Sequence, residues 1–429
     1  MINLKQRYLM IIHTSGLEGA ERLVIDLGPE SREAAHLAAA SCDLLQPLVE
    51  FVCEQDGKGE GGNERRKVVL IRFLVNLLGC PLSILSQHPE VSKEGVDVHP
   101  ATWVTMEKAC KFLSSLTSNM VNLIVEEEKD EEVEPTGLPT MYYWLLGECQ
   151  QKDEIPQVYS HLHLLHLSSP HICLLLRQTE EMRVHKGLIL LLRRLEALPP
   201  SSLPAEEAEN PVVTSLVEPL SKVIIHHDSK ELRQMGFSCY RGLLSAFSLE
   251  GRYAYFLFLL NKITHSGLLG WTVTQVKEAV SASLNPATSC ILYHGPGLVR
   301  LTNKIFALEQ GPETDLLEAS HHILDTINFS VFLLTRDKEN ITGGKTLLMP
   351  QMRDWTEKLT KGLDLSVAHY KQRLLQPEEE TGPEVQAQVG GVVMPKMDKK
   401  QRERVLKDAL NTFDLIQFNL VRLRDLLDL

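Results

Sequence analysis

The amino-acid sequence predicts an all-α protein, an irregular solenoid of HEAT- or armadillo-like helical repeats. Between segments rich in proline, glycine or charge, apolar residues recur at three- and four-residue steps, the spacing of one helix face. Hardly any segment alternates apolar and polar residues with β-branched enrichment, as a half-buried strand would. Helix pairs recur roughly every 40–50 residues, a period typical of HEAT and armadillo arrays, starting near Glu180, Ser229, Gly270 and Glu313.

The first part of the chain, residues 1–198, is expected to hold N-terminal helical repeats joined by polar loops. Glu54–Arg66 is glycine-rich and charged, and Glu126–Pro139 is an acidic run that contains prolines. Such segments bury too little apolar surface to offset the entropy of ordering them, which predicts mobile loops. The acidic run could also dock a basic partner. Val68–Leu78 is the best strand candidate, yet its length and leucine content favour a buried helix.

The second part, residues 199–429, is expected to hold HEAT-like repeats. Further loops are predicted at Pro199–Pro211 and Gln376–Lys400 because both are polar and contain prolines. Prolines lie beside the predicted helices or in their first turns, where a missing N–H is tolerated. The helices expected from Glu180 onward are Glu180–Leu198, Val212–His227, Lys230–Phe247, Arg252–Thr264, Trp271–Ala282, Ser289–Leu308, Glu313–Thr335, Gln351–Leu375 and Lys399–Leu429.

The last of these helices carries an apolar stripe that we expect to pack on the preceding repeat. Its members stand at steps of four and three residues: Val405, Ala409, Phe413, Ile416, Leu420, Leu423 and Leu427. Asp408, Asp414 and Asp425 lie off the stripe. Basic residues gather where the helix begins, and the lack of interleaved aromatics favours solubilising charge over a nucleic-acid or membrane site. They are Lys396, Lys399, Lys400, Arg402, Arg404 and Lys407.

Composition argues against several classes of function. The formal net charge is −12, so no basic excess is present to neutralise nucleic-acid phosphates. The eight cysteines occur singly without CxxC spacing, which is typical of reduced, buried thiols. No secretory signal is recognisable, and the longest apolar run, Tyr253–Leu260, is far shorter than the ~20 residues that cross a bilayer. We therefore expect a soluble, cytoplasmic protein without a membrane span or nucleic-acid partner.

No segment indicates catalysis, so we expect that the protein is not an enzyme and uses no metal or cofactor. The histidines of His161–His171 suggest a metal cluster, but the absence of HExxH and of interleaved carboxylates favours helix-surface histidines. The string ITGGKT (Ile341–Thr346) resembles the end of a phosphate loop. Glu339 stands where that loop requires its first glycine, and no buried strand is evident before it, which favours a helix–helix loop.

Several sequence blocks resemble the glomulin family, which also includes the plant aberrant-lateral-root-formation protein. Their order and spacing match that family: Arg177–Gly187, Thr264–Gly267, Gly311–Leu317, Arg336–Asn340, Gly362–Tyr370 and Val405–Leu429. The resemblance covers most of Val68–Leu429, is strongest after Glu180 and fades upstream of Gly28. Compared with the family the chain looks shorter at its N-terminus, which suggests a missing or divergent first repeat region.

The resemblance implies a HEAT-like scaffold whose C-terminal repeats bind the RING domain of the RING-box subunit of cullin–RING ubiquitin ligases. In that family the repeats cover the surface that receives the ubiquitin-charged E2, so the ligase is inhibited by steric masking. An immunophilin of the FK506-binding class and the hepatocyte growth factor receptor are further partners that the resemblance implies. A second function stays open: an adaptor that bridges signalling or trafficking proteins, since a solenoid offers an extended binding surface.

Acidic and aromatic residues of the blocks are the expected contacts, because RING surfaces that bind an E2 commonly present apolar and basic side chains. The candidates are Glu313, Asp315, Asp337, Glu339, Asn340, Asp364, His369, Tyr370 and Asp414. Each could instead serve helix capping or loop structure, and Glu313 and Asp315 stand where carboxylates favour a helix N-terminus.

Overall fold

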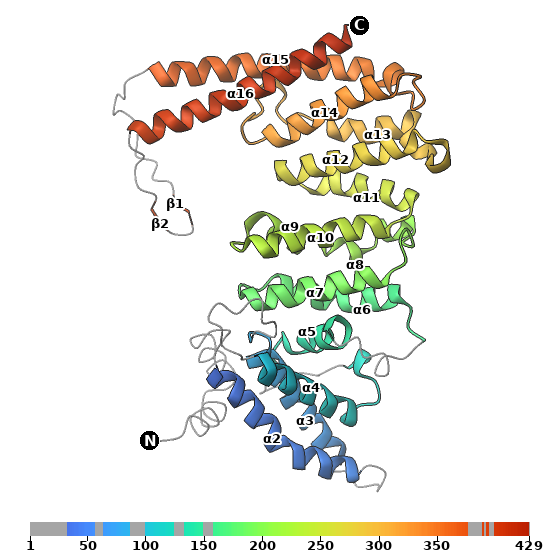
Figure 1. Ribbon diagram of the computed structural model, residues 1–429, viewed down its shortest axis with the longest axis vertical. Coiled ribbons are helices and arrows are strands. Elements are labelled where there is room, and N and C mark those ends of the chain that lie inside the picture. Colours follow the sequence, from blue (N-terminus) through green and yellow to red (C-terminus); the bar gives the residue numbers. More distant parts are fainter. Residues whose placement is uncertain are drawn as a thin grey trace. The chain divides into compact units, whose positions relative to one another are not determined.

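The structure is a computed structural model, which describes residues 32–55, 63–85, 99–123, 133–148, 158–375, 388–389, 392–393 and 399–428. Backbone contacts divide the chain into two compact units, Met1–Ser248 and Leu249–Leu429. Within the described ranges the regular elements are helices, apart from one short strand pair, which confirms the predicted all-α helical-repeat fold (Figure 1). The predicted division into residues 1–198 and 199–429 concerned the repeats and stays a prediction. The boundary between the two compact units lies after Ser248.

In unit 1 neighbouring helices pack against one another. At its beginning α2 lies against α3 and α4, and later α6 packs along α7, α7 on α10 and α10 on α9 (Figure 1). Its elements are α2 (Arg32–Glu54), α3 (Asn63–Leu77), η1 (Leu78–Leu82), α4 (His99–Leu116), η3 (Met120–Asn122), α5 (Gly137–Tyr142), η4 (Tyr143–Glu148), α6 (His161–Leu176), α7 (Glu181–Ala197), η5 (Ala205–Ala208), α8 (Pro211–Thr214), α9 (Val217–His226) and α10 (Lys230–Ala246).

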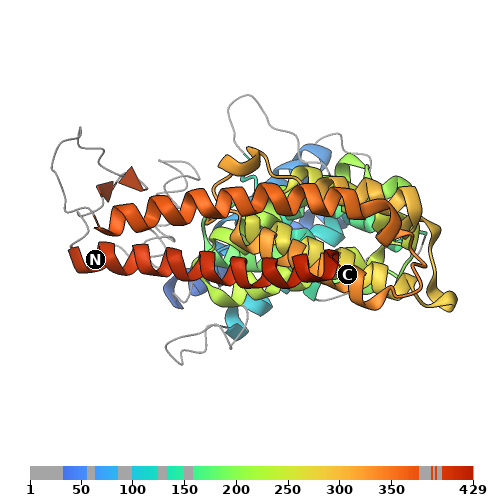
Figure 2. The same ribbon diagram turned by 90° about the horizontal axis from the view of Figure 1, so that it is seen from above.

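In unit 2 the long helices α15 and α16 lie side by side, and both contact α14, which packs along α12 (Figures 1 and 2). Two-residue strands β1 and β2 pair antiparallel between α15 and α16 in the chain. The elements of this unit are α11 (Leu249–Lys262), α12 (Ser266–Ser283), η6 (Pro286–Thr288), η7 (Ile291–Tyr293), α13 (Gly295–Ile305), η8 (Gly311–Glu313), α14 (Ser320–Arg336), α15 (Gly344–Leu375), β1 (Gln388–Val389), β2 (Val392–Val393) and α16 (Lys399–Leu427).

The apolar stripe of α16 packs on α15 and α14, as predicted, with one error at its start. Val405 is 52% exposed, whereas Leu406 is 6% exposed and takes the predicted place of Val405. Successive positions on a helix differ by ~100° around its axis, so only one of two adjacent residues can face the core. The other members are at most 5% exposed: Ala409, Phe413, Ile416, Leu420, Leu423 and Leu427.

Helix boundaries differ from the predicted ones where turns interrupt the apolar spacing. Val212–His227 is split into α8 and α9, and Ser289–Leu308 becomes η7 and α13, which begins with Gly295 at φ +51°. Glu313–Thr335 contains a turn, so α14 begins only at Ser320. Val68–Leu78 is helical, almost entirely within α3, which confirms the preference for helix over strand.

The predicted loops are shorter than expected. Glu54–Arg66 overlaps α3, which starts at Asn63, and Glu126–Pro139 overlaps α5, which starts at Gly137. Residues 56–62 of the first loop, residues 126–132 of the second and most of Gln376–Lys400 lie outside the described residues. Pro199–Pro211 contains η5, and it is anchored on the end of α10 because Leu203 N donates to Ala246 O at 2.9 Å.

A buried lysine of α7 satisfies backbone carbonyls in the interior of unit 1. Lys186 is fully buried, and its Nζ donates to the carbonyl oxygens of Leu82 at 3.1 Å, Ser83 at 2.6 Å and Leu85 at 2.8 Å. A buried carbonyl without a donor costs free energy comparable to a lost hydrogen bond. One ammonium group therefore holds the irregular chain that follows α3 against α7.

Arg183, one helical turn before Lys186 on α7, acts on the same segment. Its Nε donates to Ser83 Oγ at 2.9 Å and its Nη2 donates to Gly79 O at 3.4 Å. The guanidinium also lies 3.7 Å from Glu134 Oε1, and the two side chains are 4% and 9% exposed. The two cations lie in the Arg177–Gly187 block, so part of that block is structural.

Replacing Lys186 by Met should lower the free energy of unfolding by on the order of 3 kcal/mol, because buried carbonyls lose their donor. Burial, followed by the charge of Arg183, lowers the pKa of Lys186 from 10.5 to about 7. Between these values the unfolded chain binds more protons than the folded chain, so wild-type stability should rise with pH from 7 toward 10.5. Urea titrations between pH 7 and 10.5 should show this rise in the free energy of unfolding in the wild type but not in Lys186→Met.

The matched control is Lys230→Met, which changes an exposed lysine at the start of α10. It should keep wild-type stability within about 0.5 kcal/mol. A difference between wild type and Lys186→Met that does not change with pH would contradict the assigned pKa.

Candidate interaction surface

Three sequence blocks that lie far apart in the chain meet in unit 2. Gly362 of α15 faces η8: a Cβ at this position would stand only 2.8 Å from Pro312 O, so close approach requires glycine. Further along α15, Tyr370 meets Phe413 of α16, with ring centroids 5.3 Å apart and planes at 76°. We call this the three-block surface, made of Gly311–Leu317, Lys361–Tyr370 and Thr412–Ile416.

Four of the predicted contact residues are exposed on the three-block surface and free to meet a partner. They are Glu313, Asp364, His369 and Asp414. Within the described part of the chain, the three carboxylates make no hydrogen bond or ion pair. These three carboxylates are therefore exposed and unpaired, and each is suited to a basic side chain of a partner.

Asp315 and Tyr370 belong to the same surface but also serve the fold. Asp315 Oδ1 accepts from Leu317 N at 2.9 Å and from Glu318 N at 3.2 Å, so it caps the turn before α14. Tyr370 is half-buried against Phe413 and links α15 to α16. The sequence suggested that the charge of Asp315 favours a helix N-terminus; in the structure its carboxylate accepts hydrogen bonds from the backbone of the turn instead.

Asp337 of the Arg336–Asn340 block is turned inward. Its side chain is 1% exposed: Oδ1 accepts from Ile341 N at 2.7 Å, and Oδ2 accepts from Thr342 N at 3.0 Å and Thr342 Oγ1 at 2.5 Å. Asp337 therefore satisfies donors of its own loop and presents nothing to a partner. The physical reason is that a tight helix–helix turn leaves N–H groups that need an acceptor.

Asn340 also stabilises this loop, whereas Glu339 is exposed. Asn340 has φ +55°, accepts from Lys345 N at 2.9 Å and donates to Thr346 Oγ1 at 2.7 Å. The loop precedes α15, and Asp364 lies roughly 30 Å farther along that helix at 1.5 Å per residue. The predicted contacts therefore fall into two separate groups, and only the group around Asp364 includes several exposed carboxylates.

The string ITGGKT comprises the end of the α14–α15 loop, Ile341–Gly343, and the first residues of α15, so the predicted helix–helix loop covers only its first half. α15 begins at Gly344, directly after Gly343 at φ +71°. The backbone donors that would face a phosphate are engaged by the carboxylate of Asp337 and the hydroxyl of Thr342, which accepts from Gly344 N at 3.1 Å. Asp337 and Thr342 thus accept the hydrogen bonds that a bound phosphate would accept in a phosphate loop.

An exposed apolar group on α16 was not among the predicted contacts. Phe418 is 73% exposed, and Leu415 and Val421 are each 50% exposed, one turn before and after it. We call these three residues the α16 outer patch. Leu415 also belongs to Thr412–Ile416, so the patch overlaps the three-block surface. The sequence contains a signal for this patch, because its three apolar residues recur at three-residue steps outside the predicted buried stripe.

A carboxylate from a distant part of the chain contacts the histidine-rich helix α6, which the sequence did not predict. His166 Nε2 lies 2.8 Å from Glu207 Oε2, which also accepts from Asn210 Nδ2 at 2.9 Å. His171 stacks on Tyr142, and burial lowers the pKa of His171 to about 4. Among the residues that the structure describes, no three His, Cys, Asp or Glu side chains could share a metal, the cysteines are in the reduced form, and no helix could span a membrane.

Comparison with known proteins gives a family match and two close relatives. The family model described as "Uncharacterised protein family, YAP/Alf4/glomulin" matches residues 104–393. Glomulin of Homo sapiens is 28% identical over 408 residues, which cover 91% of this chain and 68% of the human protein. Glomulin of Mus musculus is 28% identical over 412 residues, with the same two coverages.

Replacing Asp337 by Ala should lower the free energy of unfolding by about 2–4 kcal/mol, because buried N–H groups of Ile341 and Thr342 lose their acceptor. Glu339→Ala, in the same loop but exposed, is the matched control and should change stability by less than about 0.5 kcal/mol. Chemical denaturation of both variants measures the difference. Equal, small effects would contradict the structural role of Asp337.

Proposed function

The chain belongs to the YAP/Alf4/glomulin family, and from this premise we propose that it is a non-enzymatic inhibitor of cullin–RING ubiquitin ligases. It binds the RING domain of the RING-box subunit through the C-terminal repeats, residues 199–429, and masks the surface that receives the E2. Two proteins then compete for one RING face, and no covalent step is needed. The cytoplasm is the compartment in which we place this activity.

Family membership carries this proposal, and the chemistry of unit 2 supports it. Glu313, Asp364 and Asp414 offer carboxylates to the basic side chains that commonly surround an E2-binding RING face. Phe418 offers an exposed aromatic anchor of the kind that dominates protein interfaces. An apolar centre with charged neighbours is the usual composition of such an interface.

A helical-repeat adaptor that bridges signalling or trafficking proteins is the alternative function. An FK506-binding immunophilin and the hepatocyte growth factor receptor would be partners in either case. The alternative predicts binding without competition against E2, which separates the two functions experimentally.

Replacing Phe418 by Ala should weaken binding to the purified RING-box–cullin complex by at least tenfold, about 1.4 kcal/mol, because an anchoring aromatic ring is lost. Stability should change by less than about 0.5 kcal/mol, since the ring is exposed. Ile291→Ala, which removes a 79% exposed side chain elsewhere in unit 2, is the control and should bind as wild type. Calorimetric titration measures both affinities; equal affinities would remove Phe418 from the interface.

Titration of E2 into a reconstituted ligase at fixed inhibitor concentration tests the mechanism. Raising the E2 concentration should restore ubiquitin-chain formation, because mutually exclusive ligands obey mass action. Gel filtration should show that the cullin–RING assembly stays intact with inhibitor bound. Inhibition that excess E2 does not relieve would reject competition and favour the adaptor function.

A further inference from the structure

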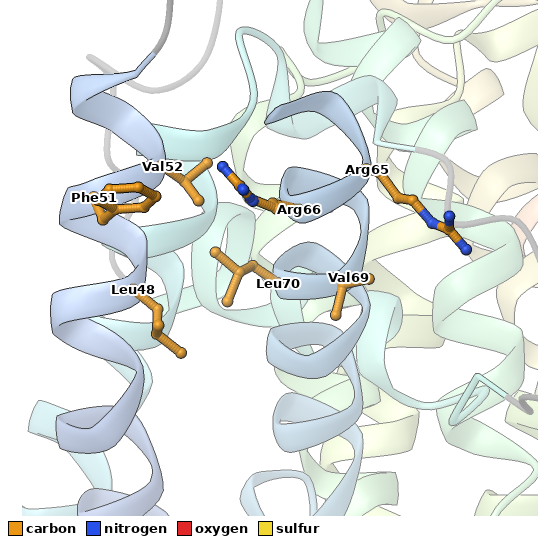
Figure 3. A pocket seen from close by; sticks show the side chains of 7 residues that line it. All are labelled: Leu48, Phe51, Val52, Arg65, Arg66, Val69 and Leu70. Carbon is orange, nitrogen blue, oxygen red and sulfur yellow. The ribbon is translucent and has the colours of Figure 1, made fainter. Parts of the chain in front are cut away.

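Unit 1 carries an open apolar groove between α2 and α3, with a volume of about 580 Å³ (Figure 3). Its floor is buried, with Val52 at 3% and Leu70 at 7% exposure. Its walls are exposed, with Leu48 at 54%, Phe51 at 47% and Val69 at 57%. Exposed apolar side chains gathered around one groove mark interaction surfaces more often than single exposed residues do.

Two arginines line this groove. Arg66 reaches from α3 toward α2, where its guanidinium carbon lies 5.7 Å from the centre of the Phe51 ring (Figure 3). Arg65 also lines the groove, and both arginines are exposed. Neither forms an ion pair with a carboxylate in the described ranges, and the adjacent Glu64 is paired with Lys67 at 3.4 Å. The positive charge at the groove is therefore available to a ligand.

The apolar row of α2 has the dimensions of a helix-binding surface. Leu44, Leu48 and Phe51 stand at steps of four and three residues, and Leu44 is 48% exposed. The row spans roughly 10 Å at 1.5 Å per residue, which is about two turns of a helix. Grooves of this form accept the apolar face of an amphipathic helix, whose anchors recur at the same steps.

We propose that the α2–α3 groove binds a partner protein through an amphipathic helix that carries acidic residues beside its apolar face. The apolar walls bury the anchors, and Arg65 and Arg66 pair with the flanking carboxylates. A second copy of this chain fits poorly, because a two-fold interface centred here would set these arginines against their own equivalents. The proposal goes beyond the ligase function, since none of the predicted RING contacts lies in unit 1.

A short fluorescein-labelled helical peptide is the probe, with leucines at the anchor steps and glutamates beside them. A companion peptide has lysines in place of the glutamates, and a second has the same residues in scrambled order. Fluorescence anisotropy with the full chain should show binding of the acidic peptide that weakens as salt rises. The lysine and scrambled peptides should bind at least about tenfold more weakly, because charge or helix-face match is lost.

Charge reversal in the groove tests the assigned contacts. Arg65→Glu/Arg66→Glu should weaken binding of the acidic peptide at least about tenfold and raise the relative affinity for the lysine peptide. The matched control, Lys230→Glu/Arg241→Glu, reverses two exposed charges on α10 and should bind as wild type. Equal binding by both double variants would overturn the proposal.

Polar substitution tests the apolar wall without threatening the fold. Leu48→Ser removes an exposed anchor and should also weaken binding about tenfold, whereas Val158→Ser at an 84% exposed position should not. Circular dichroism should show unchanged helix content and thermal unfolding for each variant. Absence of acidic-peptide binding to the wild type would overturn the proposal as well.

Two other occupants of the groove, the chain's own residues 1–31 and a second copy of the chain, would give different results. If the probe binds only after residues 1–31 are deleted, the groove is covered by the chain itself and the partner proposal is overturned. A wild-type dimer in sedimentation that dissociates in the Arg65→Glu/Arg66→Glu variant would assign the groove to a second copy, with the same consequence.

Discussion

Burial of one apolar stripe of a helix against its neighbours is the interaction on which the rest of each unit depends. A single amphipathic helix is marginal in water, so packing against the next repeat supplies its stability. In α16, Phe413, Ile416 and Leu420 face α15 and α14, and their burial fixes the rotation of the helix. The same rotation turns Asp414 and Phe418 outward. The candidate surface is therefore a consequence of core packing.

Charged residues inside the sequence blocks have two different physical roles. Lys186 and Arg183 satisfy backbone carbonyls and a hydroxyl near η1, and Asp337 satisfies backbone donors before α15. Glu313 and Asp364 remain exposed to solvent. Resemblance of a block to a family therefore identifies residues that hold irregular backbone as well as residues that can meet a partner. Burial and hydrogen bonding separate the two groups.

The two units expose surfaces of opposite character. The three-block surface and the α16 outer patch combine free carboxylates with apolar side chains, whereas the α2–α3 groove combines apolar walls with Arg65 and Arg66. Charge complementarity sets which partner each surface accepts, because like charges brought together cost free energy.

Helical class, most helix positions from α7 onward and the buried stripe of α16 were determined by the sequence, because they follow from local spacing at three and four residues. Tertiary structure decided which of Val405 and Leu406 is buried, and it decided that Asp337 turns inward. The packing of helices also brings His166 next to Glu207 and forms the groove between α2 and α3. These features depend on contacts between residues distant in the chain or on turn geometry, neither of which a helical period encodes.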